Sequence, residues 1–208
     1  KRNLTLLELL RFANGIAFAK QIGLPLNTHI TVTWNRAPGF SLKVWSERET
    51  RLRQALGRWL ERRGVQAVSA YVRENCRGRG PHTHLLIHLP QDRWHELAAE
   101  LHPFLLRSGG FHWDNGVRIT GDARGTPGMV TWRQTTGLFR YLAKGIDPKA
   151  LVLLGTEPVF LSDLLGVRPE PLATVALKRV GTCEALGPKA RKAAGWKELR
   201  HPLDLLRF

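Results

Sequence analysis

The sequence predicts an α+β fold in which helices cover an antiparallel β-sheet. Residues 28–34, 65–75 and 82–89 alternate between apolar and polar side chains, as strands with one buried face do. The last two stretches are joined by a short segment, Arg77 to Gly80, whose glycines favour a tight hairpin turn. The order strand, helix, hairpin, helix, strand, helix is typical of helices packed on an antiparallel sheet.

Helices are expected before and after the first strand. Residues 4–21 carry leucine, phenylalanine and alanine at roughly helical spacing, and the pattern breaks at Gly23. Residues 46–49 read Ser-Glu-Arg-Glu, which matches a capping box, and an apolar stripe follows them as far as Gly64. We therefore expect the second helix to begin at Ser46.

The second half of the chain is expected to contain two more helices and a strand. A helical apolar stripe opens after Pro90 and stops at Gly109, and residues 117–120 are typical of a short strand. A further helix is expected over residues 135–144, with Gly145 at its end.

The chain is expected to have three parts. Residues 1–27 form an N-terminal helix, residues 28–150 form the main α+β domain, and residues 151–208 form a basic, mainly helical C-terminal extension. A length of 208 residues suffices for one well-buried domain with such an appendage.

The charge of the chain indicates a polyanionic partner. Its 32 lysines and arginines stand against 17 aspartates and glutamates, which gives a net charge of +15. Nucleic acid is the leading candidate. A basic protein without such a partner and a peripheral membrane protein are the alternatives, because charge alone does not select among them.

The two cysteines, Cys76 and Cys183, lie far apart in the sequence, and neither belongs to a Cys-x-x-Cys pair. The sequence therefore offers neither a disulfide framework nor a complete zinc-finger signature. No apolar run approaches the roughly 20 residues of a membrane helix. We expect a cytoplasmic protein without a membrane partner.

The most informative residues are His82 and His84, which flank Thr83 on the second strand of the hairpin. A side-chain period of two points both imidazoles to the same face of the sheet. Folding the hairpin about its turn brings Glu74 opposite them, within about 5 Å between Cβ atoms. Two imidazoles and one carboxylate suit a divalent ion that acts on phosphate, such as Mg²⁺ or Mn²⁺.

Other interpretations of this group stay open. His88 shares the parity of His84, but a rise of about 3.3 Å per residue puts it roughly 13 Å away, too far to bind the same ion. Cys76 keeps a structural zinc site open. Two histidines on a strand are also more often ordinary polar residues than metal ligands.

A second pattern, Tyr141-Leu-Ala-Lys144, lies in the last expected helix. A spacing of three makes the phenol and the ammonium neighbours on one helix face. A nearby cation favours the phenolate form of tyrosine, and it can hold the phosphate that the phenolate attacks. The alternative is that Tyr141 packs in the core beside Leu138 and Leu142 and that Lys144 is simply solvated.

In their order along the chain, the strand 28–34, the pair His82-x-His84 and the pair Tyr141-x-x-Lys144 resemble the three motifs of the HUH endonuclease superfamily. The similarity covers roughly residues 28–145. It is greatest to the single-tyrosine rolling-circle replication initiators of plasmids and phages. Thr83 departs from the pattern, because the family prefers a bulky apolar residue between the histidines.

The resemblance implies an HUH-type fold, a relative of the ferredoxin-like split βαβ arrangement, for residues 28–150. It implies that Glu74, His82 and His84 hold the metal. Tyr141 would be the nucleophile, assisted by Lys144. The implied activity is metal-dependent nicking and rejoining of single-stranded DNA through a 5′-phosphotyrosine, which initiates rolling-circle replication. The implied partner is single-stranded or hairpin DNA at a replication origin, and host replication proteins are further candidates.

Arg73, Arg77 and Arg79 flank the expected metal site and are expected to bind the DNA backbone.

Two related classes of protein in the superfamily are alternative functions. A relaxase typically places its tyrosine before the histidines, and a transposase shares the order found here but is generally shorter. A non-catalytic nucleic-acid-binding module, with structural histidines and a core Tyr141, explains the charge equally well. Tyr71, the other tyrosine, is expected to be a packing residue.

Overall fold

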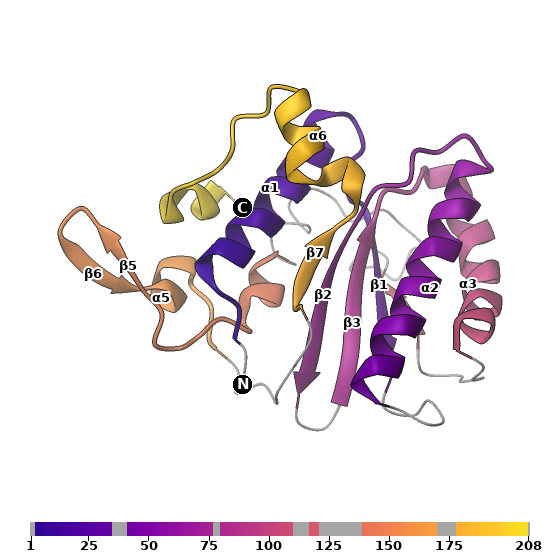
Figure 1. Cartoon of the computed structure of the whole chain (residues 1–208), viewed down its shortest axis with the longest axis horizontal. Coiled ribbons are helices and arrows are strands. Elements are labelled where there is room, and N and C mark those ends of the chain that lie inside the picture. The colour runs from indigo at the N-terminus through magenta and orange to yellow at the C-terminus, as the bar shows by residue number, and fades with distance from the viewer. Residues whose placement is uncertain are drawn as a thin grey trace.

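Figure 1 shows the protein as a computed structural model, of which residues 3–34, 41–76, 80–109, 117–120, 139–169 and 178–207 are described. Its centre is a five-stranded sheet of order β4-β1-β3-β2-β7, in which every neighbouring pair is antiparallel. The strands are β1 (Thr28–Thr33), β2 (Ser69–Cys76), β3 (Gly80–Ile87), β4 (Val117–Thr120) and β7 (Val180–Thr182). The predicted antiparallel sheet is confirmed, and β2 and β3 form the expected hairpin.

Helices cover both faces of this sheet. The long ones are α1 (Leu6–Gln21), α2 (Leu42–Glu61) and α3 (Trp94–Gly109), the last preceded by the 3₁₀ turn η1 (Gln91–Arg93). The shorter ones are α5 (Leu161–Leu165), α6 (Pro188–Ala193), η2 (Glu184–Leu186) and η3 (Pro202–Arg207). Residues 139–143 are also helical, whereas 135–138, expected in the same helix, lie outside the described residues. Within the described residues, none of these helices combines the length with the apolar character that a membrane span requires.

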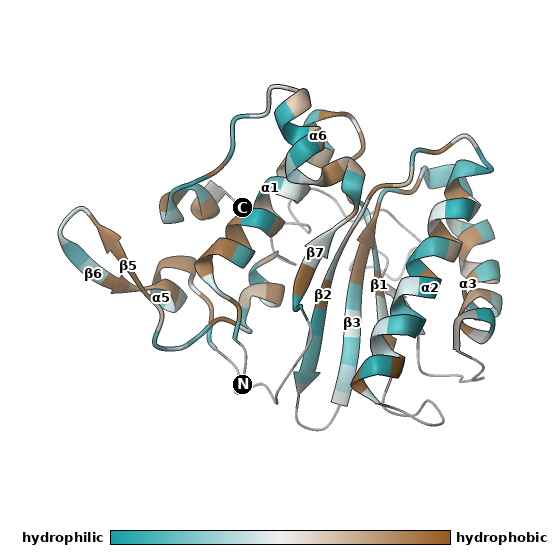
Figure 2. Ribbon diagram, in the orientation of Figure 1, coloured by the Kyte–Doolittle hydropathy of each residue, from teal (hydrophilic) through white to brown (hydrophobic). Residues whose placement is uncertain are grey.

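The alternation of the strands separates two hydrophobic cores. Ile30 and Leu85 point to one face of the sheet, where α2 and α3 pack on them. Val72 and Leu86 point to the other face and pack against α1 and segments from the C-terminal part of the chain. Figure 1 shows α2 and α3 on one side of the sheet and α1 and α6 on the other. In Figure 2 the hairpin changes from hydrophobic at one end to hydrophilic at the end where β2 stops and β3 begins.

The start of α2 differs from the expectation. The helix begins at Leu42, and Ser41 caps it by accepting a hydrogen bond from the backbone N–H of Val44 at 3.2 Å. Ser46, expected to be the cap, lies inside the helix. The earlier start allows the helix to bury Trp45 completely in the core between α2 and the sheet. Burial of this large side chain explains why the capping box at residues 46–49 does not set the boundary.

The C-terminal segment contains helices, as predicted from the sequence, but it also contains strands that were not predicted. β5 (Leu151–Leu154) and β6 (Glu157–Phe160) form a two-stranded hairpin, which projects from the body in Figure 1, and β7 is an edge strand of the central sheet. Leu165, Leu186 and Leu205 belong to the same hydrophobic core as α1. The division expected at residue 150 therefore does not separate two cores, because β7 and these leucines join both sides of it.

Thr83, the residue between the two histidines, is a buried hydrogen-bonding centre on the face of the sheet that α2 covers. Its hydroxyl accepts hydrogen bonds from the indole N–H groups of Trp34 and Trp45, each at 3.0 Å. It also donates a hydrogen bond to Oε2 of Glu49 at 3.0 Å. A bulky apolar residue could not make these bonds, so the departure from the family pattern has a structural reason in this chain.

Thr83→Val is expected to lower the free energy of unfolding by about 2–4 kcal/mol. Valine keeps the shape of threonine but removes the acceptor of two indole N–H groups and the donor to a buried carboxylate. Chemical denaturation followed by tryptophan fluorescence measures the change. Thr33→Val, at a partly exposed position of β1, is the matched control, with an expected change below about 0.5 kcal/mol. Equal effects of the two substitutions would contradict the role given to the Thr83 hydroxyl.

Candidate metal centre

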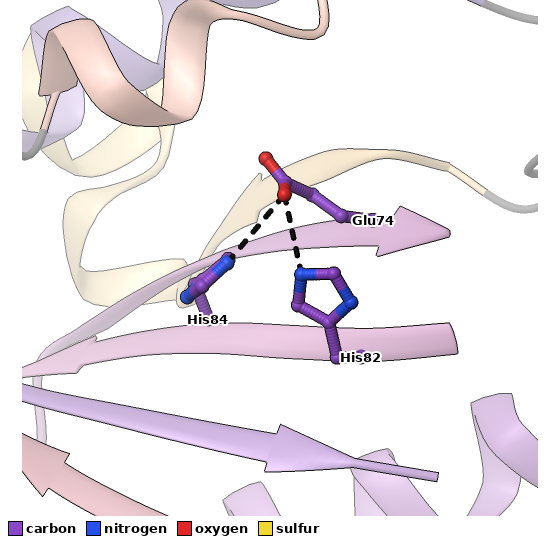
Figure 3. Close-up of side chains that lie close together, drawn as sticks. All are labelled: Glu74, His82 and His84. Atoms are coloured by element: carbon purple, nitrogen blue, oxygen red, sulfur yellow. Dashed lines mark hydrogen bonds and ion pairs between the residues drawn. The ribbon is translucent and has the colours of Figure 1, made fainter. Parts of the chain in front are cut away.

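Glu74, His82 and His84 come together on the α1 face of the sheet, at the hydrophilic end of the hairpin. Glu74 pairs with His82 across the hairpin, and His84 lies two residues further along β3 on the same face. Oε2 of Glu74 lies 3.2 Å from Nε2 of His82 and 3.6 Å from Nε2 of His84. Figure 3 shows both rings directed at this carboxylate oxygen. The three potential ligand atoms lie within 4.8 Å of one another, so the residues that the sequence predicted as a group could hold one metal ion.

The hydrogen bonds around the cluster leave its metal-binding atoms available. Nδ1 of His82 donates to the backbone carbonyl of Gly80 at 2.8 Å, so the lone pair of the neutral ring lies on Nε2, which faces Glu74. Oε1 of Glu74 and Nε2 of His84 are buried and have no hydrogen-bonding partner among the described residues. Buried polar atoms are normally satisfied, and such a pair indicates a place for an ion or a water. The donor set of two imidazoles and one carboxylate therefore fits a divalent metal.

The charges around the cluster keep its ligands in the forms that bind metal. Burial alone would raise the pKa of Glu74, but the adjacent imidazoles of His82 and His84 and the charge of Lys144 outweigh it and hold that pKa well below its usual range. For His84, burial dominates and lowers the pKa, and the nearby carboxylate of Glu74 opposes this only in part. Because His84 is then neutral near neutral pH, the ammonium of Lys144, 3.5 Å away, remains a positively charged partner of the Glu74 carboxylate.

Metal binding to this cluster is expected to weaken in acid. An imidazole binds metal only in its unprotonated form, so protons and metal compete for it. Since the pKa of His84 lies below the ordinary 6.5, the proton wins this competition only when the pH falls below about that value. Calorimetric titration with Mn²⁺ between about pH 8 and pH 5 is expected to show an affinity that falls on the acid side of about 6.5. An affinity that rises as the pH falls would exclude neutral histidines as ligands.

Tyr141 and Lys144 lie beside the cluster and touch one another. The ring of Tyr141 meets that of His84 edge-on, with 5.7 Å between centroids and an angle of 88° between planes. Nζ of Lys144 lies 4.0 Å from the centroid of the Tyr141 ring and 3.5 Å from Oε2 of Glu74. The tyrosine is 42% exposed, whereas the lysine is buried. Tyr141 is thus not a core residue, and Lys144 is not a solvated one.

Both side chains lie on the short helix of residues 139–143 and the turn that follows it, and contacts at the two ends hold this segment in place. Phe139 stacks on Phe12 of α1, with 6.1 Å between ring centroids. At the other end, the carbonyl of Gly145 accepts a hydrogen bond from the buried guanidinium of Arg179 at 3.1 Å. Both the N-terminal helix and the C-terminal segment therefore position the tyrosine.

Sequence reasoning missed His29 and Thr31, which come from the neighbouring strand β1. Nε2 of His29 lies 3.0 Å from Nδ1 of His84, and the hydroxyl of Thr31 lies 3.1 Å from the same nitrogen. The alternation of residues 28–34 already placed these two side chains on one face of a strand. Nothing in the sequence, however, indicated that β1 would pair with β3 and bring them to His84.

The structure corrects the assignment of Arg73 to DNA binding. Its guanidinium is buried and donates to both carboxylate oxygens of Glu49, at 2.7 and 3.0 Å. Adjacent residues of a strand point to opposite faces, so Arg73 lies on the other side of the sheet from Glu74 and cannot reach a phosphate at the cluster. The other two residues expected to bind DNA, Arg77 and Arg79, lie outside the part of the chain that the structure describes. The side chain of Cys76, the candidate zinc ligand, lies outside it as well.

Two expectations about residues outside the cluster are met. His88 is not part of it, because its Nδ1 donates to the carbonyl of Pro25 at 2.9 Å. Tyr71 is buried as a packing residue, and the guanidinium carbons of Arg53 and Arg73 lie 4.6 and 5.0 Å from its ring centroid.

Comparisons of the chain with protein-family models, with curated proteins and with solved structures found no match. The function of the protein is therefore inferred from the residues of the site themselves. These residues supply a donor set that could hold a metal ion and an exposed tyrosine next to it.

Proposed function

We propose that the protein is a metal-dependent, site-specific endonuclease that nicks and rejoins single-stranded DNA through Tyr141, as HUH-type replication initiators do. The observation that carries the proposal is the position of the exposed Tyr141, whose ring contacts the ring of His84. His84 is one of three buried residues that together offer a donor set for a divalent ion. The net charge of +15 supports a polyanionic substrate. In this scheme the reaction initiates rolling-circle replication of a plasmid or phage, at an origin presented as single-stranded or hairpin DNA.

Cleavage in this scheme is a transesterification. The phenolic oxygen of Tyr141 forms a bond to phosphorus, and the bond from phosphorus to the 3′-oxygen breaks. The phenol releases a proton and the departing 3′-oxygen takes one up, so a free 3′-hydroxyl results. Tyr141 then carries the 5′ end of the downstream strand. Because the phosphodiester is replaced by a phosphotyrosine, a later 3′-hydroxyl can reverse the reaction and reseal the strand without ATP.

Each side chain of the site has a role in this scheme. Glu74, His82 and His84 would hold Mg²⁺ or Mn²⁺, which would supply positive charge to polarise a non-bridging oxygen of the phosphate. Lys144, in contact with both Glu74 and the Tyr141 ring, adds positive charge where the phenolate and the phosphate are negative. Arg140 is exposed next to Tyr141 in the chain and is a candidate contact to the DNA backbone.

DNA binding is expected to weaken by roughly tenfold or more when the salt concentration rises from about 50 to 200 mM. Phosphate contacts by a strongly basic protein release counterions, and added salt opposes this release. Fluorescence titrations with labelled single-stranded, hairpin and duplex DNA measure the effect, and we expect the first two to bind more tightly than the duplex. Binding that is insensitive to salt would rule out the electrostatic argument.

The test of the proposed reaction is a covalent protein–DNA adduct that survives denaturation. A non-catalytic nucleic-acid-binding module would show the same salt dependence but would form no adduct. A relaxase or transposase of the same superfamily would form one as well. Replication of a plasmid that carries the nicked sequence separates an initiator from these two.

A further inference from the structure

His84 faces both of its neighbouring strands. Its Nε2 is directed at Glu74 of β2, 3.6 Å away. Its Nδ1 lies 3.0 Å from Nε2 of His29 and 3.1 Å from the hydroxyl of Thr31, both on β1. Thr31 is the direct cross-strand partner of His84, and the buried ring of His29 is tilted by 32° to that of His84, with 5.1 Å between centroids. The candidate metal centre therefore extends over three strands.

The position of one proton decides whether His84 can bind a metal, because a neutral imidazole carries a proton on only one ring nitrogen. A proton on Nδ1 can form a hydrogen bond to His29 or Thr31 on β1, and the lone pair of Nε2 is then free to bind a metal. A proton on Nε2 has no hydrogen-bonding partner among the described residues, because 3.6 Å to Glu74 is too long. The surroundings therefore favour the tautomer that binds metal.

The hydroxyl of Thr31 can support the tautomer of His84 that carries its proton on Nδ1. It lies within hydrogen-bonding distance of both rings, at 3.1 Å from Nδ1 of His84 and 3.3 Å from Nε2 of His29. A hydroxyl can accept one hydrogen bond and donate another at the same time. The hydroxyl of Thr31 can therefore accept a hydrogen bond from Nδ1–H of His84 and donate one to Nε2 of His29. His29 is then an acceptor on its Nε2, and it does not force the proton of His84 onto the metal-binding nitrogen.

We propose that His29 and Thr31 are positioning residues of the metal centre, which fix the tautomer and the orientation of His84 without binding the metal themselves. Partners of this kind behind a histidine ligand typically change metal affinity by about 10–100-fold. The inference concerns the same site as the proposed nuclease, and it rests on that proposal only through metal binding. It can therefore be tested without DNA.

The first test compares two double variants. His29→Phe with Thr31→Val removes both acceptors and keeps the approximate shapes, and we expect calorimetry to show Mn²⁺ affinity about 10–100-fold below that of the unaltered protein. His29→Gln with Thr31→Ser keeps an acceptor at each position and is expected to restore most of the affinity. Each single substitution of the first pair should have a smaller effect than both together, because either group can accept the same proton.

The second test reads the tautomer directly. Nitrogen-15 NMR of the metal-free protein is expected to show His84 protonated on Nδ1, and the Phe/Val variant is expected to lose this preference. If that variant does not fold, the spectrum of the unaltered protein still decides. Protonation of His84 on Nε2 in the unaltered protein, or full Mn²⁺ affinity in a folded Phe/Val variant, overturns the proposal. Absence of DNA cleavage would count against the nuclease but would leave these measurements unaffected.

Discussion

Tyr141→Phe is expected to abolish the covalent protein–DNA adduct completely. The substitution removes only the hydroxyl, and the remaining ring keeps its contacts with His84 and Lys144, so fold and metal binding should persist. A tyrosine nucleophile leaves a covalent trace that neither a water-using nuclease nor a binding module can produce. The measurement is a denaturing gel after incubation with Mn²⁺ and single-stranded oligonucleotides that span the replicon's own origin.

Tyr71→Phe is the matched control, because Tyr71 is the other tyrosine of the chain and is buried on the α2 face of the sheet. This variant is expected to keep the adduct, on the DNA fragment downstream of the cut. Lys144→Ala is expected to slow adduct formation without eliminating it. The cation stabilises negative charge on the phenolate and the phosphate but forms no covalent bond. An adduct that persists in Tyr141→Phe and maps to Tyr71 would falsify the assignment of the nucleophile.

Replacement of both β3 histidines is expected to eliminate metal binding and cleavage together. His82→Gln with His84→Gln removes the two imidazole ligands, while the amide side chains fill much of the buried space that alanine would leave empty. Mn²⁺ binding should then become undetectable by calorimetry. EDTA should stop cleavage by the unaltered protein in the same way, and added Mn²⁺ should restore it.

The matched control for this pair is His88→Gln. His88 follows the same strand, but its ring is bonded to the Pro25 carbonyl and is not part of the cluster. This variant is expected to bind Mn²⁺ and to cleave DNA as the unaltered protein does. Cleavage that survives EDTA would remove the metal from the proposed mechanism, and so would cleavage by a folded His82→Gln, His84→Gln variant.

The three proposed metal ligands could be predicted from the sequence because they lie within one hairpin. A short turn joins β2 and β3, so alternation and register together place Glu74 opposite His82 and on the same face as His84. The same alternation puts Arg73 on the other face, and its assignment to DNA binding overlooked this. The predicted start of α2 at Ser46 was wrong for another reason. Burial of Trp45 favours the earlier cap at Ser41, and burial is a property of the folded chain.

The parts that could not be predicted depend on segments far apart in the sequence. His29 reaches His84 only because β1 pairs with β3, and the alternation of a strand does not say which strand will be its neighbour. β7 is three residues long, too short for a recognisable pattern. Its Gly181 has a structural reason that only the fold reveals, because a Cβ there would lie 2.6 Å from a ring carbon of Tyr71.

β7 lies beside β2, the strand that carries Glu74, so the sheet around the cluster is incomplete until the C-terminal segment has been made. During synthesis on the ribosome, β2 presents an open edge while the intervening chain is produced, since β7 is the last of the five strands. Pairing across so long a stretch of chain is slow to form, and an open edge is a template for a strand from another molecule. A chain interrupted before residue 180 is therefore expected to aggregate and not to accumulate as a folded, metal-binding fragment.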